Sequence, residues 1–219
     1  MTTTLPRDEA EAVEIQNELR RHIRIEDDLH GPIRTAMGVD VAYRSSSDRA
    51  FGAAAVLDVA DFSVVESAVA EASSEFPYVP GLFAFREVPV LVEVLRKLSA
   101  APDVVLCDGN GIAHPRSFGL ACHLGLLLDL PTIGVAKNPM MGEYSEPGQN
   151  RGDRSPVHMN GRVVGYVLRT RPGVKPIFVS PGHKVSVDTA VQIVLDLSPR
   201  YRLPEPIRAA DHESKLARG

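Results

Sequence analysis

Apolar residues in the first third of the chain follow the periodicity of β-strands. Residues 35–43 (TAMGVDVAY), 50–60 (AFGAAAVLDVA) and 62–70 (FSVVESAVA) are short apolar or alternating runs, and a short turn around Asp61 joins the second run to the third. Consecutive strands with short connections usually pair with each other. This part of the sequence therefore predicts an antiparallel meander at the start of a sheet.

Helical periodicity precedes the meander and returns after it. Pro6, which acidic residues follow, is a favourable helix start, and a narrow apolar stripe over 15–23 predicts a helix that ends before the Gly31-Pro32 breaker. After the meander, residues 75–86 are apolar and interrupted by proline and glycine. The spacing of apolar residues then predicts a helix over about 87–98.

The middle of the chain alternates between strand and helix. Residues 102–109 (PDVVLCDG) and 131–137 (PTIGVAK) are continuously apolar, as buried strands are, and a buried helix is expected between them at 117–130. A strand–helix–strand unit favours a right-handed crossover and a parallel pair. A polar loop is predicted to follow at 138–154.

Turn and cap residues organise the last third of the chain. Asn160-Gly161 between two apolar runs is the strongest short signal for a β-hairpin. One more strand is expected at 176–182, followed by a helix over 186–198 that its first residue, a serine, would cap. Residues 200–219 are charged and are predicted to be irregular, with a frayed tail at 213–219.

The order of these elements predicts an α/β fold with a mixed sheet and helices on both faces. The chain has 219 residues, of which 44% are hydrophobic and 24% charged, which suits a single domain over 1–219 with a substantial core. No apolar run could cross a bilayer, and the charged N-terminal segment differs from a secretory signal. We therefore expect a cytoplasmic protein without a membrane partner. A monomer is the default expectation, because nothing in the sequence marks a self-association surface.

Charge and cysteine content narrow the functional classes. Cys107 and Cys122 are too few for a disulfide framework or a cysteine-rich zinc site, and buried, reduced thiols are expected. A net charge of −4 disfavours a general nucleic-acid coat protein. Six Lys and Arg residues between Arg151 and Lys175 leave two interpretations open, a solvated hairpin or a local basic groove.

Two aspartates stand where a metal site could form. Asp40 lies inside an apolar strand, where an unpaired carboxylate is costly, and Asp108 ends another strand, where ligands gather in open α/β sheets. Hard oxygen ligands without cysteine suit Mg²⁺ or Mn²⁺, which commonly support phosphodiester hydrolysis. Glu87 and Asp211 are both candidates for a third acid. Each acid is equally consistent with a helix cap or a structural hydrogen bond, and spacing does not choose between them.

A series of motifs resembles the endonuclease V family. In chain order they are GVDVAY (38–43), FPYVPGLFAFRE (76–87), VVLCDGNGIAHPR (104–116), HLGLLLDLPTIGVAK (123–137), GHKVSVDTA (182–190) and YRLPEPIRAADH (201–212). They cover most of residues 13–212 in the family's order and approximate spacing, which is more specific than any single motif. The resemblance implies a ribonuclease-H-like α/β fold: a mixed sheet with an antiparallel meander and flanking helices.

The resemblance also implies an activity and a catalytic set. It points to a Mg²⁺-dependent endonuclease of DNA repair, with Mn²⁺ as a substitute, that binds DNA containing deoxyinosine. The expected cut is at the second phosphodiester bond on the 3′ side of the lesion. Asp40 and Asp108 match the family's metal-binding aspartates and Glu87 its third acid. Lys137 matches a lysine near the reacting phosphate, and His212 a C-terminal active-site histidine.

Further positions match substrate-binding features of the family. The segment Pro77-Tyr78-Val79-Pro80 matches a wedge, whose prolines would stiffen the loop so that an inserted ring can unstack bases. Glycine permits close backbone approach to a base. We therefore take Gly81, Leu82, Phe83 and Gly109 as candidates for the base pocket. His114 and Arg116 match positions near the substrate, and we expect them to contact the nucleic-acid backbone or a phosphate.

Some residues depart from the family pattern, and some alternatives remain. Asn110, Cys122 and Asn138-Pro139 differ from the residues common in relatives, which leaves rate, metal preference and the loop after Lys137 open. The family includes members that act on DNA and others that act on inosine-containing RNA. An inosine-specific endoribonuclease, a related nuclease with another substrate, and a non-catalytic protein that binds deaminated bases therefore stay as alternatives.

Overall fold

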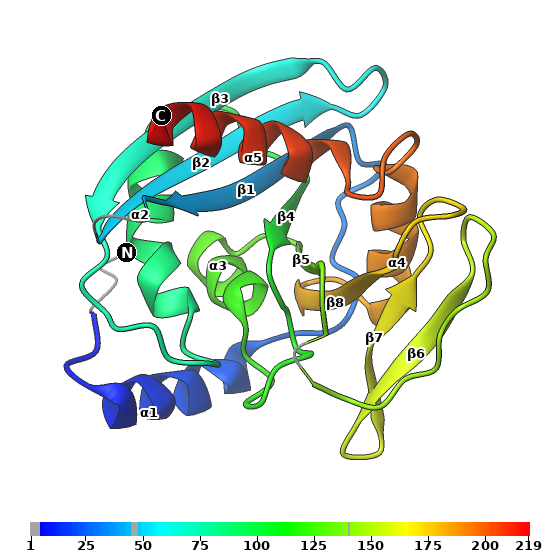
Figure 1. Cartoon of the computed structure of the whole chain (residues 1–219), viewed down its shortest axis with the longest axis horizontal. Helices are drawn as coiled ribbons and strands as arrows, with labels where there is room; N and C mark the ends of the chain where they lie inside the picture. The colour runs from blue at the N-terminus through cyan, green and yellow to red at the C-terminus, as the bar shows by residue number, and fades with distance from the viewer. Residues whose placement is uncertain (1–4, 45–47, 140) are drawn as a thin grey trace.

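The computed structural model describes residues 5–44, 48–139 and 141–219, and these form an eight-stranded sheet with helices on both sides (Figure 1). The strand order is β3-β2-β1-β4-β5-β8-β7-β6. The strands are β1 Thr35–Tyr43, β2 Arg49–Asp58, β3 Val64–Ser73, β4 Val104–Asp108, β5 Thr132–Ala136, β6 Arg154–Met159, β7 Arg162–Leu168 and β8 Ile177–His183. The helices are α1 Glu9–Leu19, the 3-10 turn η1 Arg20–His22, α2 Ala84–Leu95, α3 Leu120–Leu128, α4 Val187–Asp196 and α5 Glu205–Arg218.

The predicted pairings of the strands are confirmed. β1, β2 and β3 form an antiparallel meander, while β4 pairs in parallel with both β1 and β5. The β6–β7 turn has positive φ angles of 50° at Asn160 and 73° at Gly161, as a tight hairpin of two residues requires. Ser186 caps α4 by accepting a hydrogen bond from the Thr189 N–H.

Alternation along the central strands divides the core into two layers. Met37, Val39 and Val105 pack with α2 and α3 on one face of the sheet. Ala36 and Leu106, whose side chains alternate with those, pack with α4 and the start of α5 on the other face. Side chains on the even-numbered positions of β1 and β4 therefore point toward α4 and α5. Both cysteines are buried and unpaired, as expected.

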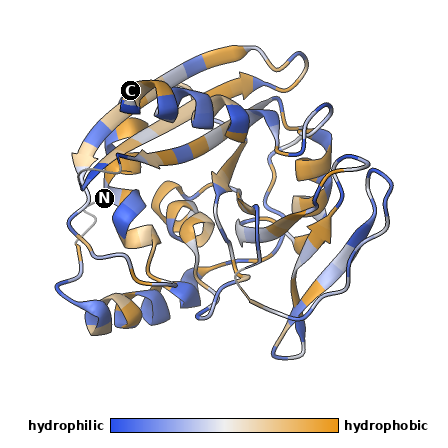
Figure 2. Ribbon diagram, viewed as in Figure 1, coloured by the Kyte–Doolittle hydropathy of each residue, from blue (hydrophilic) through white to orange (hydrophobic). Residues whose placement is uncertain are grey.

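The prediction for the C-terminal segment was wrong. Residues 205–218 form α5, which lies across β1 and β2 and continues almost to the end of the chain (Figure 1). Most of its residues are hydrophilic (Figure 2), and its narrow buried stripe consists of Pro206, Ile207, Ala210 and Ser214. The helix approaches so closely that a Cβ atom at Gly38 would lie 2.0 Å from the carbonyl oxygen of Pro206.

Two other helices differ from their predicted limits. α1 ends at Leu19 and η1 at His22, where the backbone becomes extended, and α1 buries Ala12 and Gln16 rather than the predicted apolar stripe. α2 begins at Ala84, three residues before the predicted start, because its first apolar residues enter the core. The predicted loop at 138–154 includes Met140, which lies outside the described residues, and reaches into β6, which begins at Arg154.

Candidate active site

Strand register places Asp40 and Asp108 side by side. β1 and β4 are parallel and Val39 pairs with Cys107, so the two aspartates are the next residues along neighbouring strands. Asp108 in turn pairs with Val135 of β5, two residues before Lys137. The Lys137 Nζ donates a hydrogen bond to Asp108 Oδ2 over 2.5 Å. Three residues far apart in the chain thus meet at the carboxyl ends of β4 and β5, beside β1.

Helix α5 supplies the other polar groups around Asp40. The Ser214 hydroxyl donates to Asp40 Oδ2 over 2.5 Å, and Asp211 lies close enough for its charge to act on Asp40. Asp211 also forms an ion pair with Lys215 at 2.7 Å. His212 follows Asp211 but has an exposed side chain. The sequence analysis had considered Asp211 as a third acid. It missed Ser214, because it treated this segment as irregular.

Burial and like charge raise the pKa values of two acids, Asp40 and Glu87. Burial raises the pKa of Asp40 to about 6, and the charges of Asp108 and Asp211 add to this rise, while the Ser214 hydrogen bond and Lys137 oppose it. Glu87 on α2 is buried, and burial together with the charges of Asp40 and Asp108 raises the pKa of Glu87 well above its usual range. The cluster therefore holds more negative charge than Lys137 alone offsets.

A divalent cation fits this cluster in charge and in donor chemistry. Asp40, Glu87 and Asp108 offer only carboxylate oxygens, and the pKa values of Asp40 and Glu87 are raised as they would be where a compensating cation is needed. In the described part of the chain, no three His, Cys, Asp or Glu side chains already converge closely enough to hold an ion together. Lys137 is the cation that contacts Asp108.

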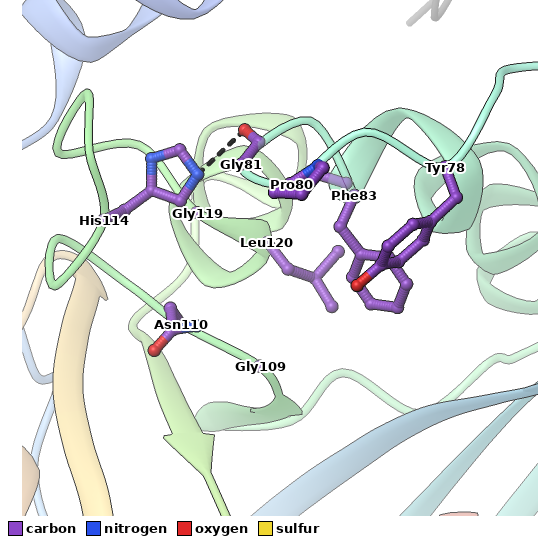
Figure 3. A pocket seen from close by; sticks show the side chains of 10 residues that line it. Tyr78, Pro80, Gly81, Phe83, Gly109, Asn110, His114, Gly119 and Leu120 are labelled. Atoms are coloured by element: carbon purple, nitrogen blue, oxygen red, sulfur yellow. Dashed lines mark hydrogen bonds between the residues drawn. The ribbon is translucent and has the colours of Figure 1, made fainter. Parts of the chain in front are cut away.

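A pocket of about 250 Å³ opens directly after Asp108 (Figure 3). It is lined by Tyr78, Pro80, Gly81, Phe83, Ala84, Gly109, Asn110, His114, Gly119 and Leu120. Three of the four predicted base-pocket residues are among them. The fourth, Leu82, is not, because its side chain is buried in a separate cluster with Ala12, Phe76 and Phe85.

Two helices begin at this pocket. α2 starts beside Phe83 and α3 beside Gly119, and neither of these two described helices has a side-chain cap. The first N–H groups of an α-helix have no partner within the helix, and they carry partial positive charge. In α2, the N–H groups of Phe85 and Arg86 already donate to carbonyl oxygens of the preceding turn, and in α3 the Ala121 N–H donates to the Asn110 carbonyl oxygen. The pocket therefore favours a ligand with hydrogen-bond acceptors mainly through the positive ends of these two helices.

The predicted wedge lies at the rim of the pocket. Tyr78 is 70% exposed, and its ring stands edge-on to Phe83 with 6.1 Å between the ring centroids. Pro77 and Pro80 are exposed beside it, whereas Val79 packs against the cluster that contains Leu82. Figure 3 shows the Tyr78 ring standing beside Phe83 at the edge of the pocket. The segment thus presents one aromatic ring on an anchored loop.

His114 and Arg116 hold the pocket wall. His114 Nε2 lies 2.9 Å from the Gly81 carbonyl oxygen (Figure 3), and Arg116 Nη2 donates to the same oxygen over 2.6 Å. Gln16 of α1, which sequence analysis missed, donates to it over 3.1 Å and accepts a hydrogen bond from Arg116. Both side chains therefore fix the Gly81 turn, and their contact with the nucleic-acid backbone or a phosphate stays a prediction. No local pattern distinguishes Gln16 from the other polar residues of α1, because its burial depends on the contact of this helix with the Gly81 turn.

None of the helices within the described ranges combines the length and the apolar character needed to span a bilayer.

Comparison with solved structures first defines the class of fold. The chain resembles A. aeolicus Argonaute with a TM-score of 0.52 at 17% identity, over 85% of this chain and 29% of that one. This likeness shows the fold alone. The mixed sheet with its meander, parallel centre and acidic residues on the central strands is a ribonuclease-H-like fold.

Closer relatives define the family. The family model described as Endonuclease V matches residues 17–212. Endonuclease V of Nostoc punctiforme is 46% identical over 208 residues, which cover 95% of this chain and 94% of the relative. The crystal structure of Endonuclease V from Streptomyces avermitilis has a TM-score of 0.91 and 47% identity, covering 99% and 96% of the two chains. This chain belongs to the endonuclease V family, which confirms the resemblance seen in its motifs.

One structural relative carries nucleic acid. Ciona intestinalis Endonuclease V, at 33% identity and a TM-score of 0.84 over 95% of this chain and 96% of that one, was crystallised with a 24mer DNA containing an inosine followed by a ribo-adenosine. The activity of the family is cleavage near deoxyinosine lesions. The chain is accordingly a DNA-repair nuclease.

Proposed function

We propose that this nuclease nicks DNA at the second phosphodiester bond on the 3′ side of deoxyinosine and that the reaction depends on Mg²⁺, for which Mn²⁺ can substitute. The observation that carries the proposal is the placement of Asp40, Asp108 and Lys137 next to the pocket that begins at Gly109. A base in the pocket would leave its own strand running past the carboxylates. The proposal includes DNA as the partner, action as a monomer, and a cytoplasmic location, which two free thiols suit.

Asp40, Asp108 and Glu87 would hold the metal ion. When bound, such an ion polarises the phosphodiester, lowers the pKa of a water molecule and stabilises the leaving oxygen. Lys137 holds a positive charge 2.5 Å from Asp108, where it can stabilise charge that develops on the phosphate. Ser214 orients Asp40 through its hydrogen bond, and Asp211 adds negative charge nearby. His212 stays a prediction, as a group on α5 that a bound strand would approach.

The pocket chemistry favours hypoxanthine over adenine. Hypoxanthine presents acceptors at O6 and N7, whereas adenine replaces O6 with an amino donor. The positive ends of α2 and α3, which meet at the pocket, favour these acceptors and oppose the amino group. Guanine adds a 2-amino group, which a closely fitting pocket excludes. Tyr78 at the rim would fill the gap that the flipped base leaves.

The first experiment compares duplexes that differ by one inosine. We expect nicking only of the strand that contains deoxyinosine, at the second bond on its 3′ side, with Mg²⁺ and not with EDTA. Matched oligonucleotides with inosine in RNA test the endoribonuclease alternative. A preference for RNA, or cleavage that ignores inosine, would contradict the proposed substrate.

The second experiment tests the metal assignment. Asp108→Asn should lower Mg²⁺-dependent nicking about a thousand-fold or more, because a metal ion contributes several kcal/mol to the transition state. The variant should still fold and still bind inosine DNA in EDTA. The matched control is Asp188→Asn, which should keep full activity. Asp188 is an exposed acid on α4 that pairs with Arg154 of β6. Cleavage retained by Asp108→Asn would refute the assignment. Loss of inosine binding together with cleavage would favour a structural role.

A further inference from the structure

A second concave site lies beyond Lys137, on the side away from the base pocket. It has a volume of about 470 Å³ and is bounded by parts of two segments, 137–149 and 173–178. We call it the Tyr144 groove, after the aromatic residue in its lining. Lys137 lines this groove and also donates to Asp108, while Gly109, next to Asp108, lines the base pocket. The acidic site therefore lies between the base pocket and the Tyr144 groove.

Two arginines fix the walls of this groove. Arg169 is buried and donates to the carbonyl oxygens of Gly148, over 3.0 Å, and of Val174, so it joins the two walls. Arg202 donates to the carbonyl oxygen of Lys137 over 2.9 Å and, over the same distance, to those of Lys175 and Pro176. The groove is therefore formed before any ligand arrives, and the peptide of Lys137 is tied to it.

The groove lining combines an exposed ring with positive charge. Tyr144 is 39% exposed, and its ring makes a T-shaped contact with Phe178, with 5.2 Å between the centroids, which holds the ring in place. Lys175 is exposed and forms no ion pair with any residue that the structure describes. Glu146 is the acid in the lining, and it lies 3.8 Å from Arg169. Lys137, Lys175 and Arg169 outnumber this single acid, so the lining carries a net positive charge.

The structure gives different roles to the basic residues between Arg151 and Lys175, for which the sequence allowed either a solvated hairpin or a basic groove. Arg151 donates to three carbonyl oxygens, and Arg154 stacks on Tyr166 and pairs with Asp188. These arginines support the fold. Lys175, at the end of the stretch, lines the groove with a free ammonium group.

We propose that the Tyr144 groove binds the nucleotides on the 3′ side of the cleaved bond, with one base stacked on Tyr144 and one phosphate beside Lys175. The inference rests on the proposed cut: if the inosine occupies the base pocket, the strand crosses the acids in the 3′ direction and reaches Lys137 and then the groove. An aromatic face beside cationic side chains is the usual arrangement for binding single strands.

The test varies strand length on one side of the cut. Single-stranded inosine oligonucleotides keep a constant 5′ part and carry one, two, four or eight nucleotides beyond the cleaved bond. For the wild type we expect kcat/KM to rise roughly ten-fold once the groove is filled, as one stacked base commonly provides. Tyr144→Ala and Lys175→Ala should lose most of this gain while they cleave the shortest substrate normally. Tyr144→Phe, which keeps the ring, should retain the gain.

Matched controls separate the groove from general effects. Tyr201 is 42% exposed and packs on Arg208, so Tyr201→Ala removes a comparable ring elsewhere. Arg162→Ala removes an exposed charge at the tip of the β6–β7 hairpin. Both should keep the dependence on length. The proposal is overturned if Tyr144→Ala lowers all lengths equally, or if the Tyr144-dependent gain follows extension of the 5′ side instead.

Failure of the proposed function gives a different result. It would appear in the wild type, as cleavage that does not depend on inosine or falls at another bond. In that case, anisotropy of the same oligonucleotides in EDTA still measures whether 3′ extension strengthens binding through Tyr144. A binding gain that Tyr144→Ala abolishes would support the groove, and its absence would refute it.

Discussion

Asp40 is a carboxylate in an environment that opposes its charge. It lies on β1 under α5, where burial and the charges of Asp108 and Asp211 raise its pKa to about 6. The Ser214 hydrogen bond and Lys137 stabilise the charged form but do not cancel these effects. Without a divalent cation, this residue therefore costs folding free energy at neutral pH. The placement is unfavourable for stability and suits a site that must attract a cation.

This cost should appear as a pH-dependent effect of Asp40→Asn. The folded pKa is above the unfolded value, so the favourable contribution is complete below about pH 4 and is lost as pH rises through about 6. In EDTA, the variant should gain about 1–3 kcal/mol of unfolding free energy over the wild type near pH 8 and little near pH 4. Urea unfolding across this range measures the difference. A difference that does not change with pH would contradict the raised pKa.

At the scale of elements, two glycines, one within β1 and one directly after β4, have different roles. Gly38 lies on β1 where the backbone of α5 passes, and a Cβ there would lie 2.0 Å from the Pro206 oxygen. Gly109 follows β4 and lines the base pocket, and a Cβ there would meet only Leu120, at 3.5 Å. The first glycine allows a helix to dock, whereas the second leaves space for a ligand.

The pair Gly38→Ala and Gly109→Ala tests this difference. Gly38→Ala should lower the unfolding free energy by about 3 kcal/mol, because backbone cannot move aside as a flexible side chain can. Gly109→Ala should change stability by less than about 1 kcal/mol but lower kcat/KM on inosine DNA about ten-fold or more, since its methyl group occupies the pocket. Urea unfolding and cleavage assays on both variants provide the comparison, and each variant is the control for the other. Equal losses of stability would contradict it.

At the scale of the whole molecule, the proposed substrate-binding features follow one line along the sheet. The proposed wedge and base pocket lie on the side of α2 and α3, the acids lie within β1 and at the end of β4, and the Tyr144 groove lies beyond β5. The net charge is −4, so attraction to DNA depends on local lysines and arginines rather than on the total charge. In the proposed complex, a duplex would open locally before its strand could follow this line, and Tyr78 at the rim would keep it open.

The wedge prediction therefore depends on the form of the substrate. Tyr78→Ala should weaken binding to deoxyinosine duplex about ten-fold and binding to the same single strand by less than about three-fold, because only the duplex pays for unstacking. Anisotropy titrations in EDTA measure both affinities. Losses of equal size for the two forms would show that Tyr78 only contacts the flipped strand. Tyr201→Ala, with a similarly exposed ring, should change neither.

Local sequence determined most of the strands and the position of the acids within them. The runs around Val39 and Cys107, the Asn160-Gly161 turn and the Ser186 cap depend on periodicity, turn geometry and hydrogen bonds between near neighbours, so they can be predicted without the fold. Asp40 and Asp108 could be chosen because a carboxylate in an apolar strand is costly wherever that strand lies.

Tertiary structure decided what surrounds those acids. Residues 205–218 become a helix because Gly38 allows their small-residue stripe to settle on β1, and only then do Asp211 and Ser214 reach Asp40. The Gly81 turn is likewise held by side chains from α1 and from the loop before α3, and the Tyr144 groove by arginines remote in the chain. These contacts depend on which surfaces meet after the strands have ordered, which no local pattern specifies.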